Sequence, residues 1–105
     1  MADAEAIREG VKRLLRAAPG ARVILFGSRA RGDADARSDV DFLVVEPQVG
    51  SRLAEMVRLT EVLRPLAMAA DVFVVSEEQF QYWRDTPNTL VYRALKEGKV
   101  YETVA

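Results

Sequence analysis

Two aspartates, Asp39 and Asp41, stand at the start of the apolar run V-D-F-L-V-V (40–45). Side chains alternate along a strand, so both carboxylates should project from one face, roughly 6.6 Å apart at ~3.3 Å per residue. Aspartate is disfavoured in strands, and two neighbouring negative charges are costly unless a cation neutralises them. Hard divalent cations such as Mg²⁺ are held by one or two carboxylates together with phosphates. The pair predicts a divalent-metal site; the alternative is that Asp39 caps the strand entrance and Asp41 is solvated.

A glycine–serine turn precedes the aspartates. Residues 21–26 form an apolar, β-branched run between two glycine-containing turns, as expected of a buried strand. Gly27 lets the main chain approach a ligand closely, and Ser28 is a good helix N-cap. The turn from Arg29 to Arg31 would direct free N–H groups at an anion bound at its start. Alone, the turn is better explained as the passage from strand to helix; beside the aspartates, it predicts a site for a nucleoside triphosphate and its magnesium.

These residues resemble a known group. G-S-R-A-R-G (27–32) followed by S-D-V-D-F (38–42) is similar to the signature of the minimal nucleotidyltransferases of the DNA polymerase β superfamily. The resemblance implies an α/β (α+β) fold of the polymerase-β-like nucleotidyltransferase type, with a small mixed β-sheet packed against helices. It covers nearly the whole chain, and we therefore expect a single minimal nucleotidyltransferase domain over residues 1–105.

The resemblance also implies a third carboxylate on a later strand. Asp71 opens the run A-D-V-F-V-V-S (70–76), where nothing about strand formation requires an acid, although a strand-entry cap is the alternative. By resemblance, Asp39 and Asp41 would bind two Mg²⁺ ions, with Mn²⁺ as a substitute. Asp71 would bind one ion and help deprotonate the acceptor hydroxyl. The chain has no His and no Cys, so imidazole and thiolate chemistry do not compete with this mechanism.

The expected nucleotide-binding residues are Gly27, Ser28, Arg29 and Arg31. The two arginines stand at i and i+2 and cannot share one helix face, so at most one should reach the phosphates. Residues 8–37 carry eight Lys/Arg against three Asp/Glu, a positive block that suits a triphosphate. The sequence pI near 5.5 argues against general nucleic-acid binding.

Periodicity predicts the remaining elements. Apolar residues at helical spacing predict a first helix that ends near Pro19, and a capping box at Ser76–Gln79 opens a third. A second helix is expected over residues 51–63, with its apolar residues facing inward: Leu53, Met56, Val57, Leu59, Val62 and Leu63.

Near the C-terminus, Thr86 or Asn88 should cap a fourth helix that runs to Glu97, and residues 99–103 should form an edge strand. Phe80 and Trp83 stand three positions apart and are expected to pack on the sheet. The roles of three tyrosines stay open: Tyr82, Tyr92 and Tyr101.

Composition sets the outer limits. A chain of 105 residues that is 50% hydrophobic has the size and composition of one domain. Because it contains no Cys, it cannot have a disulfide framework. No secretory signal and no apolar run of ~20 residues is visible, so we expect no membrane association and a cytoplasmic location.

The family resemblance implies a function. The chain is expected to transfer a nucleoside monophosphate, AMP from ATP or another nucleoside triphosphate, to a hydroxyl. Minimal members of the family pair with helical toxins of the higher-eukaryote and prokaryote nucleotide-binding (HEPN) type, and some transfer AMP to a toxin tyrosine. An antitoxin that modifies such a partner is therefore the first hypothesis, in a homo- or hetero-oligomer. The alternatives are a binding module that neutralises the toxin by contact alone and a small-molecule adenylyltransferase.

Overall fold

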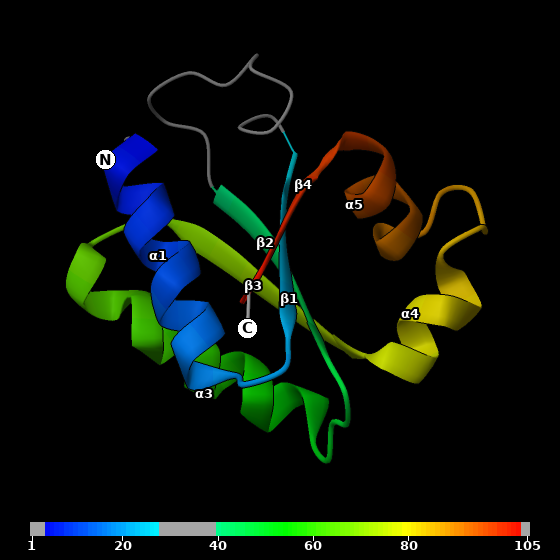
Figure 1. Cartoon of the computed structure of the whole chain (residues 1–105), viewed down its shortest axis with the longest axis horizontal. Helices are drawn as coiled ribbons and strands as arrows, with labels where there is room; N and C mark the ends of the chain where they lie inside the picture. Colours follow the sequence, from blue (N-terminus) through cyan, green and yellow to red (C-terminus); the bar gives the residue numbers. More distant parts are fainter. Residues whose placement is uncertain (1–3, 28–39, 104–105) are drawn as a thin grey trace.

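The computed structural model describes residues 4–27 and 40–103 (Figure 1). Within these ranges, four strands form one sheet: β1 (Arg22–Phe26), β2 (Val40–Glu46), β3 (Ala70–Ser76) and β4 (Lys99–Glu102). The strand order is β3-β2-β1-β4. β1 runs antiparallel to both β2 and β4, while β2 and β3 are parallel. The sheet is mixed, as the resemblance implied.

Helices cover both faces of the sheet. α1 (Ala4–Ala17) and α3 (Arg52–Leu63), the latter followed by the short 3₁₀ helix η1 (Arg64–Leu66), pack on one face. α4 (Glu77–Trp83) and α5 (Leu90–Glu97) pack on the other, on the right in Figure 1. The parallel β2–β3 pair needs a crossover connection, and α3 with η1 provides it. The expected α/β fold, a small mixed sheet packed against helices, is confirmed.

Two hydrophobic cores lie on opposite faces of the sheet. Val40, Phe42 and Val44 belong to the core beneath α1 and α3, whereas Leu43 and Val45 belong to the core beneath α4 and α5. This division confirms the alternation expected for β2. A central strand that is covered on both faces is apolar at nearly every position. The position of Asp41 in such a strand is therefore exceptional.

Of the two capping predictions that fall on described residues, one is confirmed and one is wrong. The Ser76 hydroxyl accepts from the Gln79 amide at 3.1 Å, and the Gln79 side chain accepts from the Ser76 amide, which completes the capping box of α4. The cap expected at Thr86 or Asn88 is wrong. α5 is capped by Thr89, whose hydroxyl accepts from the Tyr92 amide at 3.2 Å. Asn88 has a φ of 70° and belongs to the turn before the cap.

Two other expectations are corrected. Leu53 and Val57 were expected to face inward, but they are 72% and 57% exposed. The apolar positions of α3 span more of the helix surface than the stripe that contacts the sheet, and Leu59 and Leu63 occupy that stripe. Trp83 was expected to pack on the sheet with Phe80, but its side chain is 41% exposed.

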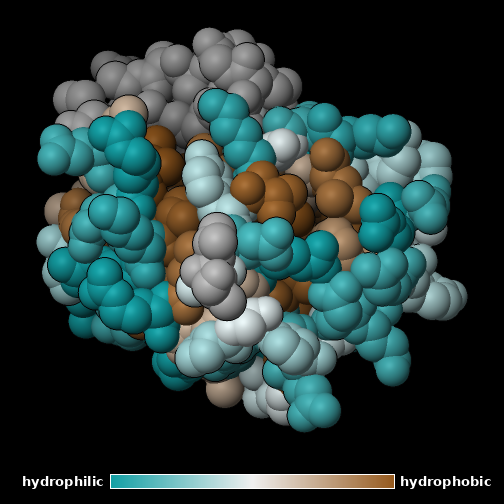
Figure 2. All heavy atoms as spheres, in the orientation of Figure 1, coloured by the Kyte–Doolittle hydropathy of each residue, from teal (hydrophilic) through white to brown (hydrophobic). Residues whose placement is uncertain are grey.

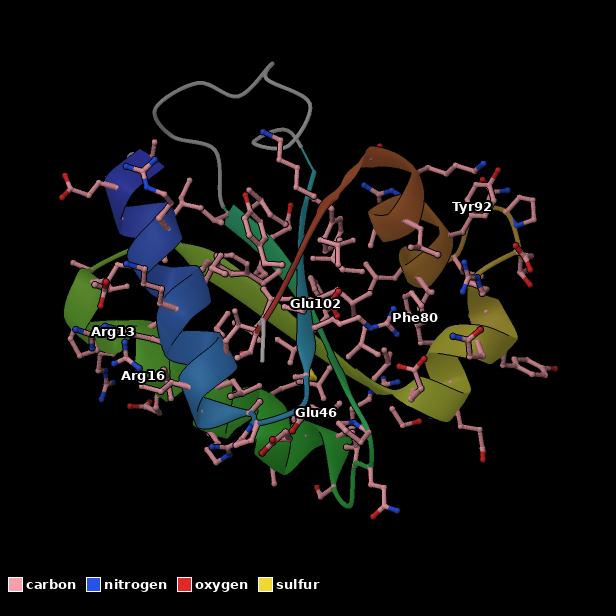
Figure 3. All side chains as sticks on the ribbon, viewed as in Figure 1. Arg13, Arg16, Glu46, Phe80, Tyr92 and Glu102 are labelled. Atoms are coloured by element: carbon pink, nitrogen blue, oxygen red, sulfur yellow. The ribbon has the colours of Figure 1, made fainter. Side chains whose placement is uncertain are left out.

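Phe80 packs as expected. Its ring is fully buried in the core beneath α4 and α5 (Figure 3), and the Arg22 guanidinium lies over it, 4.5 Å from the ring centroid. Arg22 also donates to the Glu77 carboxylate at 2.5 Å. These contacts attach α4 to the start of β1.

The surface is mixed. Figure 2 shows hydrophilic residues along α1 and over the α4 side, with hydrophobic surface visible between α1 and the sheet. This pattern suits helices that each bury one stripe. Among the described residues, no helix has both the length and the apolarity needed to cross a membrane.

Candidate functional site

Asp41 is positioned by the end of β1. The register pairs it with Phe26, the last residue of that strand, so its carboxylate lies where the chain leaves the sheet at Gly27. Gly27 is buried and has a φ of 82°, a conformation that favours glycine. A Cβ placed on Gly27 would overlap Oδ2 of Asp41 and lie 3.4 Å from its Cγ. Gly27 therefore leaves the space that the Asp41 carboxylate occupies against the main chain.

Asp71 is brought beside Asp41 by the parallel pairing of β2 and β3. The two residues are direct partners in the register, and neighbouring strands lie about 4.8 Å apart. Asp41 stands two residues before Leu43 on β2, and Asp71 stands two residues before Phe73 on β3. Because side chains two residues apart share a face, both aspartates point to the sheet face that carries Leu43 and Phe73. Asp41 is half-buried and Asp71 is exposed. Two predicted ligands, separated in the sequence by α3, thus share one face at one end of the sheet.

The arrangement suits a hard cation that is shared with an anionic ligand. Carboxylate oxygens are the donors that Mg²⁺ prefers, and an ion between Asp41 and Asp71 would offset the repulsion of two adjacent negative charges. Among residues 4–27 and 40–103 there is no group of three potential metal-ligating side chains. Asp41 and Asp71 are thus a pair of candidate metal ligands within this part of the chain. Substrate phosphates and water commonly supply the remaining ligands of a Mg²⁺ ion bound by one or two carboxylates.

Four predicted site residues lie outside the described residues: Ser28, Arg29, Arg31 and Asp39. Their proposed roles in phosphate and metal binding stay predictions. The structure describes Gly27, Asp41 and Asp71 and brings these three together.

A second polar cluster lies at the other end of the sheet. Glu46 ends β2, is only 9% exposed and lies beside α3 (Figure 3). Arg58 donates to both carboxylate oxygens of Glu55, at 2.6 and 2.7 Å. Burial and the neighbouring Glu55 carboxylate raise the pKa of Glu46 to about 7. The Arg58 guanidinium and a hydrogen bond with Glu46 lower the pKa of Glu55 to about 2.

This cluster was not predicted from the sequence. The available signal was a glutamate that directly continues an apolar strand, next to a Glu–Arg pair at i and i+3 on the following helix. Glu46 stands five positions after Asp41 on the same strand, about 17 Å away at ~3.3 Å per residue. The cluster therefore does not belong to the aspartate site.

Comparison with known proteins assigns the family. The family model of the nucleotidyltransferase domain matches residues 4–102. This chain belongs to the nucleotidyltransferase domain family. A comparison with curated proteins finds no match. The resemblance noted in the sequence is thereby confirmed at the level of family and fold, and the expected transferase class is confirmed with it.

Solved structures share this fold. A chain of a toxin–antitoxin structure with AMP-PNP aligns with a TM-score of 0.65 and 22% identity, over 90% of this chain and 73% of that one. A nucleotidyltransferase-like protein of Sulfolobus solfataricus aligns with a TM-score of 0.59 and 27% identity, over 74% and 70% of the two chains. A chain of the MntA–HpeT toxin–antitoxin, in a mutant form, aligns with a TM-score of 0.61 and 25% identity, over 91% and 72%.

Proposed function

We propose that this chain is a Mg²⁺-dependent adenylyltransferase that acts in the cytoplasm as an antitoxin, by transferring AMP from ATP to a tyrosine of a HEPN-domain toxin. The observation that carries the proposal is the pairing of Asp41 with Asp71 on one sheet face, against the glycine turn that ends β1. This arrangement occurs in a chain of the nucleotidyltransferase domain family.

The chemistry assigns a task to each described residue. Gly27 would let the main chain approach the triphosphate closely, and Asp41 and Asp71 would hold the metal ions together with Asp39, which lies outside the described residues. Two Mg²⁺ ions, when bound, neutralise charge on the triphosphate and on the leaving pyrophosphate. Asp71 accepts the proton of the acceptor hydroxyl. The acceptor oxygen forms a bond to the α-phosphorus, the bond from that phosphorus to the bridging oxygen breaks, and pyrophosphate leaves.

The solved relatives support the choice of nucleotide and partner. One is a toxin–antitoxin structure that includes AMP-PNP, an analogue of ATP. Another is the MntA–HpeT toxin–antitoxin. A toxin is therefore the first acceptor to test, and a complex of the two proteins is the expected assembly.

The deciding experiment is intact-mass spectrometry of the protein encoded by the neighbouring reading frame, which the proposal takes to be the toxin, after incubation with this chain, ATP and Mg²⁺. We expect a mass gain of one AMP that is absent with Asp41→Asn and present with Asp85→Asn. The control removes one carboxylate from an exposed position in the connection between α4 and α5.

The other outcomes favour the alternatives. A complex that neutralises the toxin with no mass gain would replace the proposal with an antitoxin that acts by contact alone. If the chain neither binds nor modifies the toxin but consumes ATP in an Asp41-dependent reaction, a small-molecule acceptor takes its place.

A further inference from the structure

A hollow of about 320 Å³ opens beside Asp71. It lies between α3 and the first half of β3, and its lining includes Leu53, Val57, Asp71 and Phe73. The two α3 residues are the ones that the sequence placed in the core and the structure places on the surface. The walls of this hollow are therefore largely apolar, and Asp71 contributes a carboxylate at one end of the strand.

A second hollow of about 370 Å³ continues along the same strand. Its lining includes Met56 and Phe73, which both hollows share, together with Trp83 and Leu90 from α4 and α5. The two hollows form one trough along the outer edge of β3, from Asp71 to Trp83. We call it the β3 trough. It joins Asp71, one of the two described aspartates of the proposed active site, to an apolar surface.

The bottom of the β3 trough is an edge strand. In the described sheet, β3 pairs with β2 on one side only. The Ala69 carbonyl accepts from the Val40 amide and so faces β2. Because main-chain groups alternate in direction along a strand, those of Ala70, Val72 and Val74 face outward. Natural edge strands are commonly protected by Lys, Pro or a bulge, and residues 70–76 contain neither Lys nor Pro.

We propose that the β3 trough binds an extended, apolar segment of the acceptor protein, which pairs with β3 and presents its hydroxyl at Asp71. The inference rests on the proposed function, because it names the surface that brings acceptor and site together. The position of Asp71 within the trough favours an acceptor over an unrelated partner. An added strand satisfies the outward main-chain groups, and its alternating side chains can enter both hollows, whereas a helix offers no main-chain partners.

The matched variants lie on α3. Val57→Glu places a charge in the β3 trough, and Ala54→Glu places the same charge at an exposed position of the same helix that lines neither hollow. Both positions are on the surface, so both variants should fold. The chain contains one Trp, and labelling with 5-fluorotryptophan therefore gives a single ¹⁹F signal from the trough.

Docking is measured without nucleotide, by titrating the labelled chain with the unlabelled toxin of the neighbouring reading frame. We expect a shift of the ¹⁹F signal with the wild type and Ala54→Glu, and at least tenfold weaker binding with Val57→Glu. Equal binding by the two variants, or no docking by the wild type, would overturn the proposal. A wild-type homodimer that Val57→Glu dissociates would overturn it in favour of a second copy of this chain.

The docking proposal and the proposed function can be refuted independently of each other. Wild-type docking without transfer of AMP would refute the adenylyltransferase and leave the docking surface in place. Transfer of AMP by Val57→Glu at the wild-type rate, with unchanged docking, would refute the docking surface and leave the enzyme.

Discussion

Replacement of Gly27 by alanine should weaken binding at the site in addition to destabilising the fold. Gly27 has a φ of 82°, where a residue with a Cβ costs about 1–2 kcal/mol. The new methyl group would also overlap Oδ2 of Asp41, so the carboxylate must move away from the turn. The backbone penalty corresponds to a fall in melting temperature of roughly 4–15 °C for a domain of this size.

Gly20→Ala provides the matched control. Gly20 has the same φ of 82°, but its added Cβ would meet only the Pro47 ring, at 3.3 Å. The two variants should therefore lose similar stability from the backbone, and only Gly27→Ala should displace Asp41. The difference between them isolates the effect of the carboxylate position.

Calorimetric titration with ATP and Mg²⁺ at a temperature where both variants are folded makes the comparison. We expect Gly27→Ala to bind at least about tenfold more weakly than Gly20→Ala, a difference of about 1.4 kcal/mol. Equal affinities would refute the reasoning that Gly27 and Asp41 together form the nucleotide and metal site.

Two further predictions concern stability. Between pH ~4.5 and ~7, Glu46 keeps its proton in the folded protein but has released it in the unfolded chain, so the free energy of unfolding of the wild type falls as pH rises. Glu46→Gln removes this titration and should flatten the pH dependence of the free energy of unfolding over that range. At pH 8 the variant should be more stable by up to roughly 2–3 kcal/mol, measured by urea unfolding, and an unchanged slope would contradict the buried, protonated carboxyl. Ser76→Ala should lower stability by about 1 kcal/mol through loss of the α4 cap while ATP affinity is retained; a lower affinity at full stability would place Ser76 in the site instead.

Local features were predictable from the sequence. The alternation in residues 40–45 depends only on the two-residue period of a strand, and the cap at Ser76 depends on neighbours within one helical turn. The strand that begins near Asp71 was predictable for the same reason. The start of α5 was not, because Thr86, Asn88 and Thr89 offer competing local caps and only the path of the turn selects among them.

Relations between distant residues depend on how the elements pack. The order of residue types indicates that Asp41 and Asp71 each open an apolar strand, but the parallel register of β2 and β3 makes them neighbours. The exposure of Leu53 and Val57 likewise follows from how α3 packs against β3 and α1, which its own periodicity does not specify. Burial of Glu46 depends on α3 covering the end of β2. Periodicity is a short-range property, whereas register, helix rotation and burial depend on contacts between elements that are distant in the chain.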